Sequence, residues 1–203
     1  MITKSMWGTR QGSPTMDGIR ADHVARYLFA IEIGKHLDVH FVLDAGCGIG
    51  YGSYLMAERM GVHVCAMEID PHAIAFGERH YSHLGVHRYQ ENLAKAAIPP
   101  VQMITAFEII EHFDEAPGFL RSASVTADVL VGSVPNQDVV PFDAAKHPGH
   151  VRHYTPDEIL HLLETTGWKC DFIGSQIGKH GKDADIVEST DGRTLVFSAS
   201  SAS

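Results

Sequence analysis

Three side chains that can take part in proton transfer or metal binding lie within five residues, namely Glu108, Glu111 and His112, and His150 lies further along the chain. An unperturbed imidazole titrates near neutral pH, so a histidine can take a proton from a hydroxyl during a reaction. We expect His112 to be the first candidate for such a general base and His150 the second.

The group follows directly on the apolar run 101–107, which has the character of a buried strand. In sheets of parallel strands flanked by helices, ligands bind outside the carboxyl ends of the strands. We therefore expect the glutamates and His112 to lie in a binding site at that edge of the sheet.

A second chemical feature is the run 41–52, an apolar segment that breaks into a turn with glycine at every second position. Glycine can adopt a positive φ and lets a ligand lie against the backbone, while the first N–H groups of the next helix face that ligand. A dinucleotide-binding turn would need its third glycine at position 51, where this chain has Tyr51. The spacing therefore argues against a pyrophosphate ligand.

The pattern Asp44-x-Gly46-x-Gly48-x-Gly50 resembles motif I of the class I methyltransferases that depend on S-adenosylmethionine (SAM). The resemblance implies that the acidic residue closes the first strand, and that the glycines, with Cys47 between them, pass beneath the methionine and ribose of SAM. SAM carries no phosphate, so the absence of a phosphate-binding lysine from this turn fits that cofactor.

A second match follows the apolar run 62–67, where Glu68, Ile69, Asp70 and Pro71 come next. In the family, an acidic residue at the end of the second strand accepts hydrogen bonds from both ribose hydroxyls. Glu68 occupies that position and Ile69 follows it into the cofactor site. Asp70 is expected to cap the next helix, with Pro71 at its first position.

Two further matches are looser. The string 17–30 resembles the helix before motif I, where Arg26 or Tyr27 can reach the SAM carboxylate, although both residues could equally pack or be solvated. Glu91 and Asn92 follow the third strand, where the family places an acidic or amide group near the adenine, although either could be a solvated loop residue.

The string Phe107-Glu108-x-x-Glu111-His112 resembles motif IV of the ubiquinone-type O-methyltransferases, which implies that Phe107 and Glu108 contact the cofactor. It also resembles the metal-binding motif of the small-RNA terminal 2′-O-methyltransferases, which implies Glu108, Glu111, His112 and His150 as ligands of Mg²⁺ or Mn²⁺. Relatives that use no metal share the His-x-x-x-Tyr-Thr string that begins at His150. We therefore expect no metal ion and keep the four residues as an alternative.

The alternation of predicted strands and helices along the chain indicates an α/β fold. We expect a Rossmann-like, seven-stranded, mostly parallel sheet with helices on both faces and an antiparallel last strand. The strands are expected in the apolar run that opens at residue 41 and at 62–67, 86–90, 101–107, 125–133, 168–175 and 194–199. Helices are expected from about residue 17, after the glycine turn, from 72, from about 115 and from 156. Residues 1–16 are expected to be a flexible segment, and 17–203 a single methyltransferase domain.

The composition limits the partners. The 203 residues carry a net charge of −9, which disfavours nucleic acid and anionic membranes. We expect no membrane span, because no apolar run approaches the roughly 20 residues that a span needs, and no secretory signal, because no charged and apolar regions of that kind open the sequence. The three cysteines are far apart and fit reduced thiols, so we expect a cytoplasmic location.

These observations predict a SAM-dependent methyltransferase that acts on a small-molecule or glycan-type acceptor, at a hydroxyl oxygen, and releases S-adenosylhomocysteine. One alternative is a divalent-metal-dependent RNA 2′-O-methyltransferase, and another is a SAM-binding protein without catalysis. An NAD-dependent oxidoreductase ranks last, because Tyr51 replaces the required glycine and no Tyr-x-x-x-Lys pair is present. The acceptor and the oligomeric state stay open.

Overall fold

The computed structural model describes residues 12–202. Residues 1–11 of the predicted flexible segment, and Ser203, lie outside the described residues, and the boundary at residue 17 stays a prediction. Close to that boundary, Ser13 is buried, and the Tyr81 hydroxyl donates a hydrogen bond of 2.7 Å to its carbonyl oxygen.

The described residues form a seven-stranded sheet in the order β3-β2-β1-β4-β5-β7-β6. All neighbouring pairs are parallel except the two that involve β7, which runs antiparallel to β5 and β6. The strands are β1 (Phe41–Ala45), β2 (His63–Glu68), β3 (Val86–Gln90), β4 (Val101–Phe107), β5 (Ala127–Pro135), β6 (Trp168–Gln176) and β7 (Thr194–Ser201). The predicted sheet with its antiparallel last strand is confirmed.

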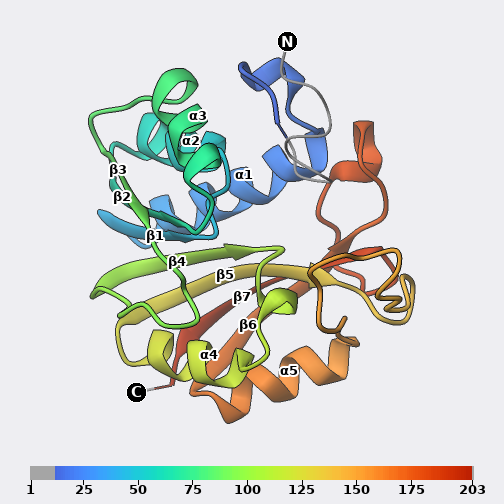
Figure 1. The fold of residues 1–203 in the computed structure, drawn as a ribbon. Helices are drawn as coiled ribbons and strands as arrows, with labels where there is room; N and C mark the ends of the chain where they lie inside the picture. Colours follow the sequence, from blue (N-terminus) through green and yellow to red (C-terminus); the bar gives the residue numbers. More distant parts are fainter. Residues whose placement is uncertain (1–11, 203) are drawn as a thin grey trace.

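Helices cover both faces of the sheet, with α1, α2 and α3 on one side and α4 and α5 on the other (Figure 1). The helices are α1 (Ala21–His36), α2 (Tyr51–Met60), α3 (Pro71–His80), α4 (Ala116–Ser124) and α5 (Pro156–Thr165), with short 3₁₀ turns η1 (Met16–Gly18), η2 (Ile110–His112) and η3 (Gly181–Ala184). Within residues 12–202, no helix combines the length and the apolar character needed to cross a bilayer.

Two of the predicted starts differ from the structure by two residues or more. The first helix begins at Ala21 rather than near 17, because residues 16–18 form a separate 3₁₀ turn and Arg20 has extended backbone. β5 begins two residues later than predicted. The reason is that Thr126 is held in the turn after α4, where its hydroxyl donates to the carbonyl oxygens of Ser122 and Ala123 at 3.1 and 3.2 Å.

The predicted helix starts are confirmed where a polar cap was recognised. The Asp70 carboxylate accepts a hydrogen bond of 2.9 Å from the His72 N–H, with Pro71 at the first helical position. Thr155 and Glu158 form a reciprocal capping box at the start of α5.

The central strands are buried on both faces. Val42 and Met103 pack into the core beneath α1 and α2, whereas Leu43 and Ile104 pack into the core beneath α4 and α5. This arrangement explains why β1 and β4 are continuous apolar runs in the sequence.

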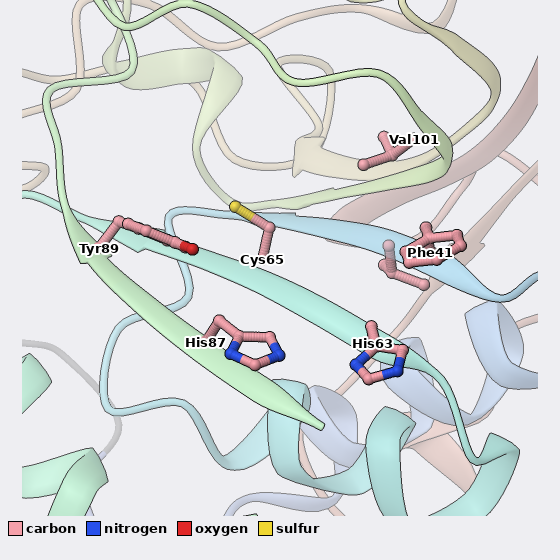
Figure 2. A pocket seen from close by; sticks show the side chains of 7 residues that line it. Phe41, His63, Cys65, His87, Tyr89 and Val101 are labelled. Atoms are coloured by element: carbon pink, nitrogen blue, oxygen red, sulfur yellow. The ribbon is translucent and has the colours of Figure 1, made fainter. Parts of the chain in front are cut away.

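One part of the sheet lacks a covering helix. The connection 91–100 from β3 to β4 contains no helix, and on that face the rings of Phe41, His63 and His87 lie side by side across β1, β2 and β3 (Figure 2). Each adjacent pair is stacked at 5.7 Å between ring centroids. Phe41 and Tyr89 are 55% and 49% exposed there. At these ring positions the sheet is therefore covered by helices on the α1–α3 side only.

Candidate active site

A cavity of about 840 Å³ lies at the carboxyl ends of the parallel strands. It is formed by α1, the turn after β1, the ends of β2 and β4, and the loops that follow β3 and precede α5. The residues predicted from the sequence that line it are Arg26, Tyr27, Gly46, Cys47, Gly48, Glu68, Ile69, Glu91, Asn92, Phe107, Glu108, His112 and His150. The structure therefore brings together residues that are far apart in the sequence.

Asp44 and Gly50 lie behind the wall of the cavity rather than in its lining. The Asp44 carboxylate is 1% exposed and accepts hydrogen bonds from the hydroxyls of Tyr27, Ser53 and Thr105, at 3.1, 2.6 and 2.9 Å. Burial raises the pKa of Asp44, while the three hydroxyl donors oppose that rise. In this structure Asp44 ties α1, α2 and β4 to the end of β1, and a direct role on the cofactor stays a prediction.

The glycine turn is left-handed at each predicted glycine, with φ values of +72°, +55° and +76° at Gly46, Gly48 and Gly50. A Cβ on Gly46 would lie 2.8 Å from the Ile109 side chain, whereas a Cβ on Gly48 would meet nothing within 4 Å. The backbone at Gly48 is therefore open to a ligand, and only glycine adopts these angles without strain.

Glu68 fixes this turn to the end of β2. One carboxylate oxygen accepts a hydrogen bond of 3.0 Å from the Gly48 N–H, and the other accepts from the N–H groups of Ile69 and Asp70, at 3.0 Å each. The side chain is 5% exposed and lies at the cavity wall. A carboxylate held in this way presents an acceptor beside the open glycine backbone.

Arg26 is buried between α1 and the end of β4, with only 1% of its surface exposed. Its guanidinium lies 3.2 Å from a Glu108 carboxylate oxygen and 3.6 Å from that of Asp22. Glu108 also accepts a hydrogen bond of 3.0 Å from the Ser133 hydroxyl and has a positive φ of 53°. Such a backbone conformation is uncommon for a residue with a side chain, and strained residues of this kind cluster at functional sites.

The sequence analysis missed Arg20, His23 and Tyr51, which also line the cavity. The Arg20 guanidinium lies 2.6 Å from Nε2 of His23, and Nδ1 of His23 lies 2.9 Å from the Tyr51 hydroxyl. Burial, followed by the charges of Arg26 and Arg20, lowers the pKa of His23 to about 2. His23 and Arg26 are three residues apart in α1, so their shared helix face was a signal that could have identified His23, whereas Arg20 precedes the helix.

His112 and His150 line the cavity, and the buried Glu111 lies next to them, with one ligand atom from each of the three residues within 4.8 Å of the others. Glu111 is fully buried, and neither of its carboxylate oxygens accepts a hydrogen bond from the residues that the structure describes. Burial, and then the nearby Glu108 carboxylate, raise the pKa of Glu111 well above its usual range. A buried carboxylate without donors is costly, so this position is one where a proton or a cation would be stabilising.

His150 belongs to a larger group of rings that includes His147 and His153, both missed by the sequence analysis. Nδ1 of His150 lies 3.0 Å from Nε2 of His153, and Nδ1 of His153 lies 2.6 Å from the Val140 carbonyl oxygen. Burial, and then the charges of His112, His153 and His147, lower the pKa of His150 to about 4. The recurrence of histidine at 147, 150 and 153 was the available sequence signal.

Known proteins share this fold and give the family to which the chain belongs. The fold is that of the class I SAM-dependent methyltransferases. A family described as "Methyltransferase domain" matches residues 20–171, which is most of the chain, and the chain belongs to that family.

Curated relatives point to the same cofactor. One from Mycobacterium tuberculosis, named "Probable S-adenosylmethionine-dependent methyltransferase", is 32% identical over 136 residues, covering 63% of this chain and 48% of the relative. One from Mycolicibacterium smegmatis with a similar name is 29% identical over 139 residues, covering 64% and 52%. The chain thus spans about half the length of the curated relatives it matches.

Solved structures share the fold at low identity. A SAM-dependent methyltransferase from Mesorhizobium loti superposes with a TM-score of 0.69 at 13% identity, covering 88% of this chain and 99% of that one. The N-methyltransferase NodS from Bradyrhizobium japonicum, in complex with S-adenosylhomocysteine, gives 0.67 at 12% identity, with 90% and 88% covered. The methyltransferase domain of bacterial CtHen1-C gives 0.66 at 16% identity, with 90% and 100% covered.

Proposed function

We propose that this protein transfers a methyl group from SAM to a hydroxyl oxygen of a small-molecule or glycan-type acceptor. The observation that carries this proposal is the layout of the cavity. The glycine turn and Glu68 form one part of its wall, and the imidazoles of His112 and His150 form another. A cofactor site and two candidate bases therefore share one enclosed space.

The residues present fit SAM. The open backbone at Gly48 accommodates a ligand lying against the turn. The fixed carboxylate of Glu68 suits two vicinal ribose hydroxyls, because an ionised carboxylate only accepts hydrogen bonds. Glu91 and Asn92 line the cavity, and we assign them to contacts with the adenine ring. Arg26 also lines it and is assigned to the SAM carboxylate, which a guanidinium can bind with two parallel hydrogen bonds.

When bound, SAM supplies an electrophilic methyl group on a sulfonium. The contribution of the chain is to hold the acceptor in line with that methyl group and to exclude water. Nδ1 of His112 lies 2.7 Å from the Gly149 carbonyl oxygen, which only accepts, so that nitrogen carries a hydrogen. In the neutral ring Nε2 is then unprotonated and can take the proton of the acceptor hydroxyl.

The chemistry of the acceptor follows from charge and precedent. The net charge of −9 disfavours a polyanionic acceptor. A structural neighbour, 1,6-didemethyltoxoflavin-N1-methyltransferase from Burkholderia thailandensis, is described with its small-molecule substrate and S-adenosylhomocysteine bound, at 19% identity. The small size of that substrate supports the acceptor proposed here, whereas the nitrogen that the neighbour methylates differs from the hydroxyl oxygen that we propose. The three free cysteines fit a reducing cytoplasm as the place of action.

The test combines binding and turnover. We expect calorimetric titration of metal-stripped protein to give micromolar dissociation constants for both SAM and S-adenosylhomocysteine. We then expect methyl-labelled SAM to label members of a panel of hydroxylated metabolites and free glycans. Cofactor binding without transfer to any acceptor would favour a SAM-binding protein without catalysis. Absence of binding by folded protein would overturn the proposal.

The buried Glu111 carboxylate favours a second candidate, a divalent-metal-dependent RNA 2′-O-methyltransferase. Glu111, His112 and His150 would hold Mg²⁺ or Mn²⁺, since a carboxylate and two imidazoles fit such ions. A bound ion would engage ribose hydroxyls. Glu108, the fourth predicted ligand, is outside this cluster and pairs instead with Arg26. The match to the methyltransferase domain of CtHen1-C is a match of fold at 16% identity.

For this candidate, we expect titration of metal-stripped protein with Mn²⁺ to show one site, and Glu111→Gln to weaken binding at least about tenfold, by removing the charged ligand. Glu164→Gln changes an exposed carboxylate on α5 in the same way and serves as the control. Restoration by Mn²⁺ of methyl transfer to an RNA 3′ end after chelation would support this candidate. Transfer that is unaffected by chelation would exclude it.

A further inference from the structure

One backbone carbonyl and two histidines form a chain of hydrogen bonds that leads from the loop before α5 to the cavity. The chain runs from the Val140 carbonyl oxygen to His153 at 2.6 Å, and from His153 to His150 at 3.0 Å. His153 is 2% exposed and does not line the cavity, whereas His150 does. His153 is therefore placed to act on the cavity only through His150.

The direction of these hydrogen bonds follows from which atoms can donate. A carbonyl oxygen only accepts, so Nδ1 of His153 must carry a hydrogen. Burial opposes a second hydrogen on the same ring, because a charged imidazolium would lose its hydration there. Nε2 of His153 is then an acceptor, and the nitrogen that donates to it is Nδ1 of His150.

The same logic carries over to His150. Because its Nδ1 carries the hydrogen, the neutral ring has an unprotonated Nε2 on its opposite side. That nitrogen is left for the cavity, where a ligand atom of His150 lies within 4.8 Å of one from Glu111 and one from His112.

We propose that His153 is a positioning residue that fixes His150 in the tautomer with an unprotonated Nε2 at the acceptor end of the cavity. The inference rests on the proposed function for the use of that nitrogen, which either accepts the hydrogen bond of the acceptor hydroxyl or binds a cation. In both uses the lone pair of Nε2 is required, and the opposite tautomer would place a hydrogen there instead. Residues that hydrogen-bond the far nitrogen of a functional histidine commonly set its tautomer in this way.

The tautomer can be measured without any ligand. In protein labelled with ¹⁵N-histidine, two-bond ¹H–¹⁵N correlation spectra at neutral pH distinguish a protonated nitrogen from an unprotonated one. We expect His150 to show a protonated Nδ1 and an unprotonated Nε2. His153→Phe keeps a ring of similar size but removes the acceptor, so we expect the His150 signals to move toward the Nε2-protonated form. His153→Gln offers an amide oxygen and should restore much of the original form.

Turnover gives the second readout, with the acceptor that the labelled-methyl assay identifies. We expect His153→Phe to lower kcat about tenfold with little change in the KM for SAM, and His153→Gln to recover most of it. His161→Phe changes an exposed histidine on α5 in the same way, so it should change neither readout.

A protonated Nε2 on His150 in the unsubstituted protein would overturn the proposal. So would a His153→Phe variant with an unchanged His150 tautomer and unchanged kcat. Failure of methyl transfer would not affect the spectrum, which separates failure of this inference from failure of the proposed function.

Discussion

Glu68→Ala is expected to weaken SAM binding by about 10²- to 10⁴-fold. The carboxylate accepts hydrogen bonds from Gly48, Ile69 and Asp70, so it both shapes the glycine turn and is placed to receive the ribose hydroxyls. Hydrogen bonds to a charged group contribute about 1.5–3 kcal/mol each, and two lost contacts to the ribose therefore account for a change of this size.

Titration calorimetry with SAM and with S-adenosylhomocysteine measures this loss. Glu164→Ala removes an exposed carboxylate from α5 and should leave both affinities unchanged. Glu68→Gln is a sharper variant, because its amide group can accept on one side only and must turn a donor toward the backbone N–H groups on the other. A Glu68→Ala protein that keeps its thermal unfolding midpoint and binds SAM normally would contradict the cofactor site proposed here.

His112→Ala is expected to lower kcat by about 10²- to 10⁴-fold, the usual contribution of a general base. The dissociation constant for SAM should change little, because the cofactor contacts proposed here come from the glycine turn, α1, and the ends of β2 and β3. The expected split between turnover and binding is what distinguishes a base from a residue that only shapes the cavity.

The measurement is kcat with the identified acceptor, beside calorimetry for SAM. His161→Ala, on the exposed side of α5, is the matched control. The acceptor used must be a hydroxyl that is protonated at neutral pH, because a deprotonated acceptor would not need a base. With such an acceptor, an unchanged kcat in His112→Ala would exclude His112 as the general base. The corresponding His150 variant would then be examined next.

The fold was predictable because most of its signals are local. Glycine at 46, 48 and 50, the Asp70–Pro71 cap and the Thr155 capping box each act within a few residues of sequence. The apolar strands were recognisable because burial on both faces removes polar residues from them. A predicted boundary was wrong where a side chain held the backbone in a turn, as the Thr126 hydroxyl does before β5.

The site was predictable only in part, because its details depend on contacts across the fold. Glu68, His112 and His150 could be placed by motif, and the structure puts all three at one cavity. The sequence could not show that Asp44 would be buried behind the turn, or that Glu108 would pair with Arg26 rather than join Glu111. Nor could it show that His153 would lie beneath His150, since that contact depends on the path of the loop from Val140.

The missing helix between β3 and β4 bears on local stability. Strands packed on one side bury less apolar surface and open more readily than the centre of a sheet. Glu68 ends β2, and Glu91 and Asn92 follow β3, so the proposed adenosine contacts come from this half of the sheet. A ligand held there adds its binding free energy to the folded form of those strands. Cofactor affinity and the resistance of β2 and β3 to local opening are therefore coupled. A substitution in the core between α3 and these strands that makes them open more readily would weaken the binding of adenosine, although the substituted residue does not contact it.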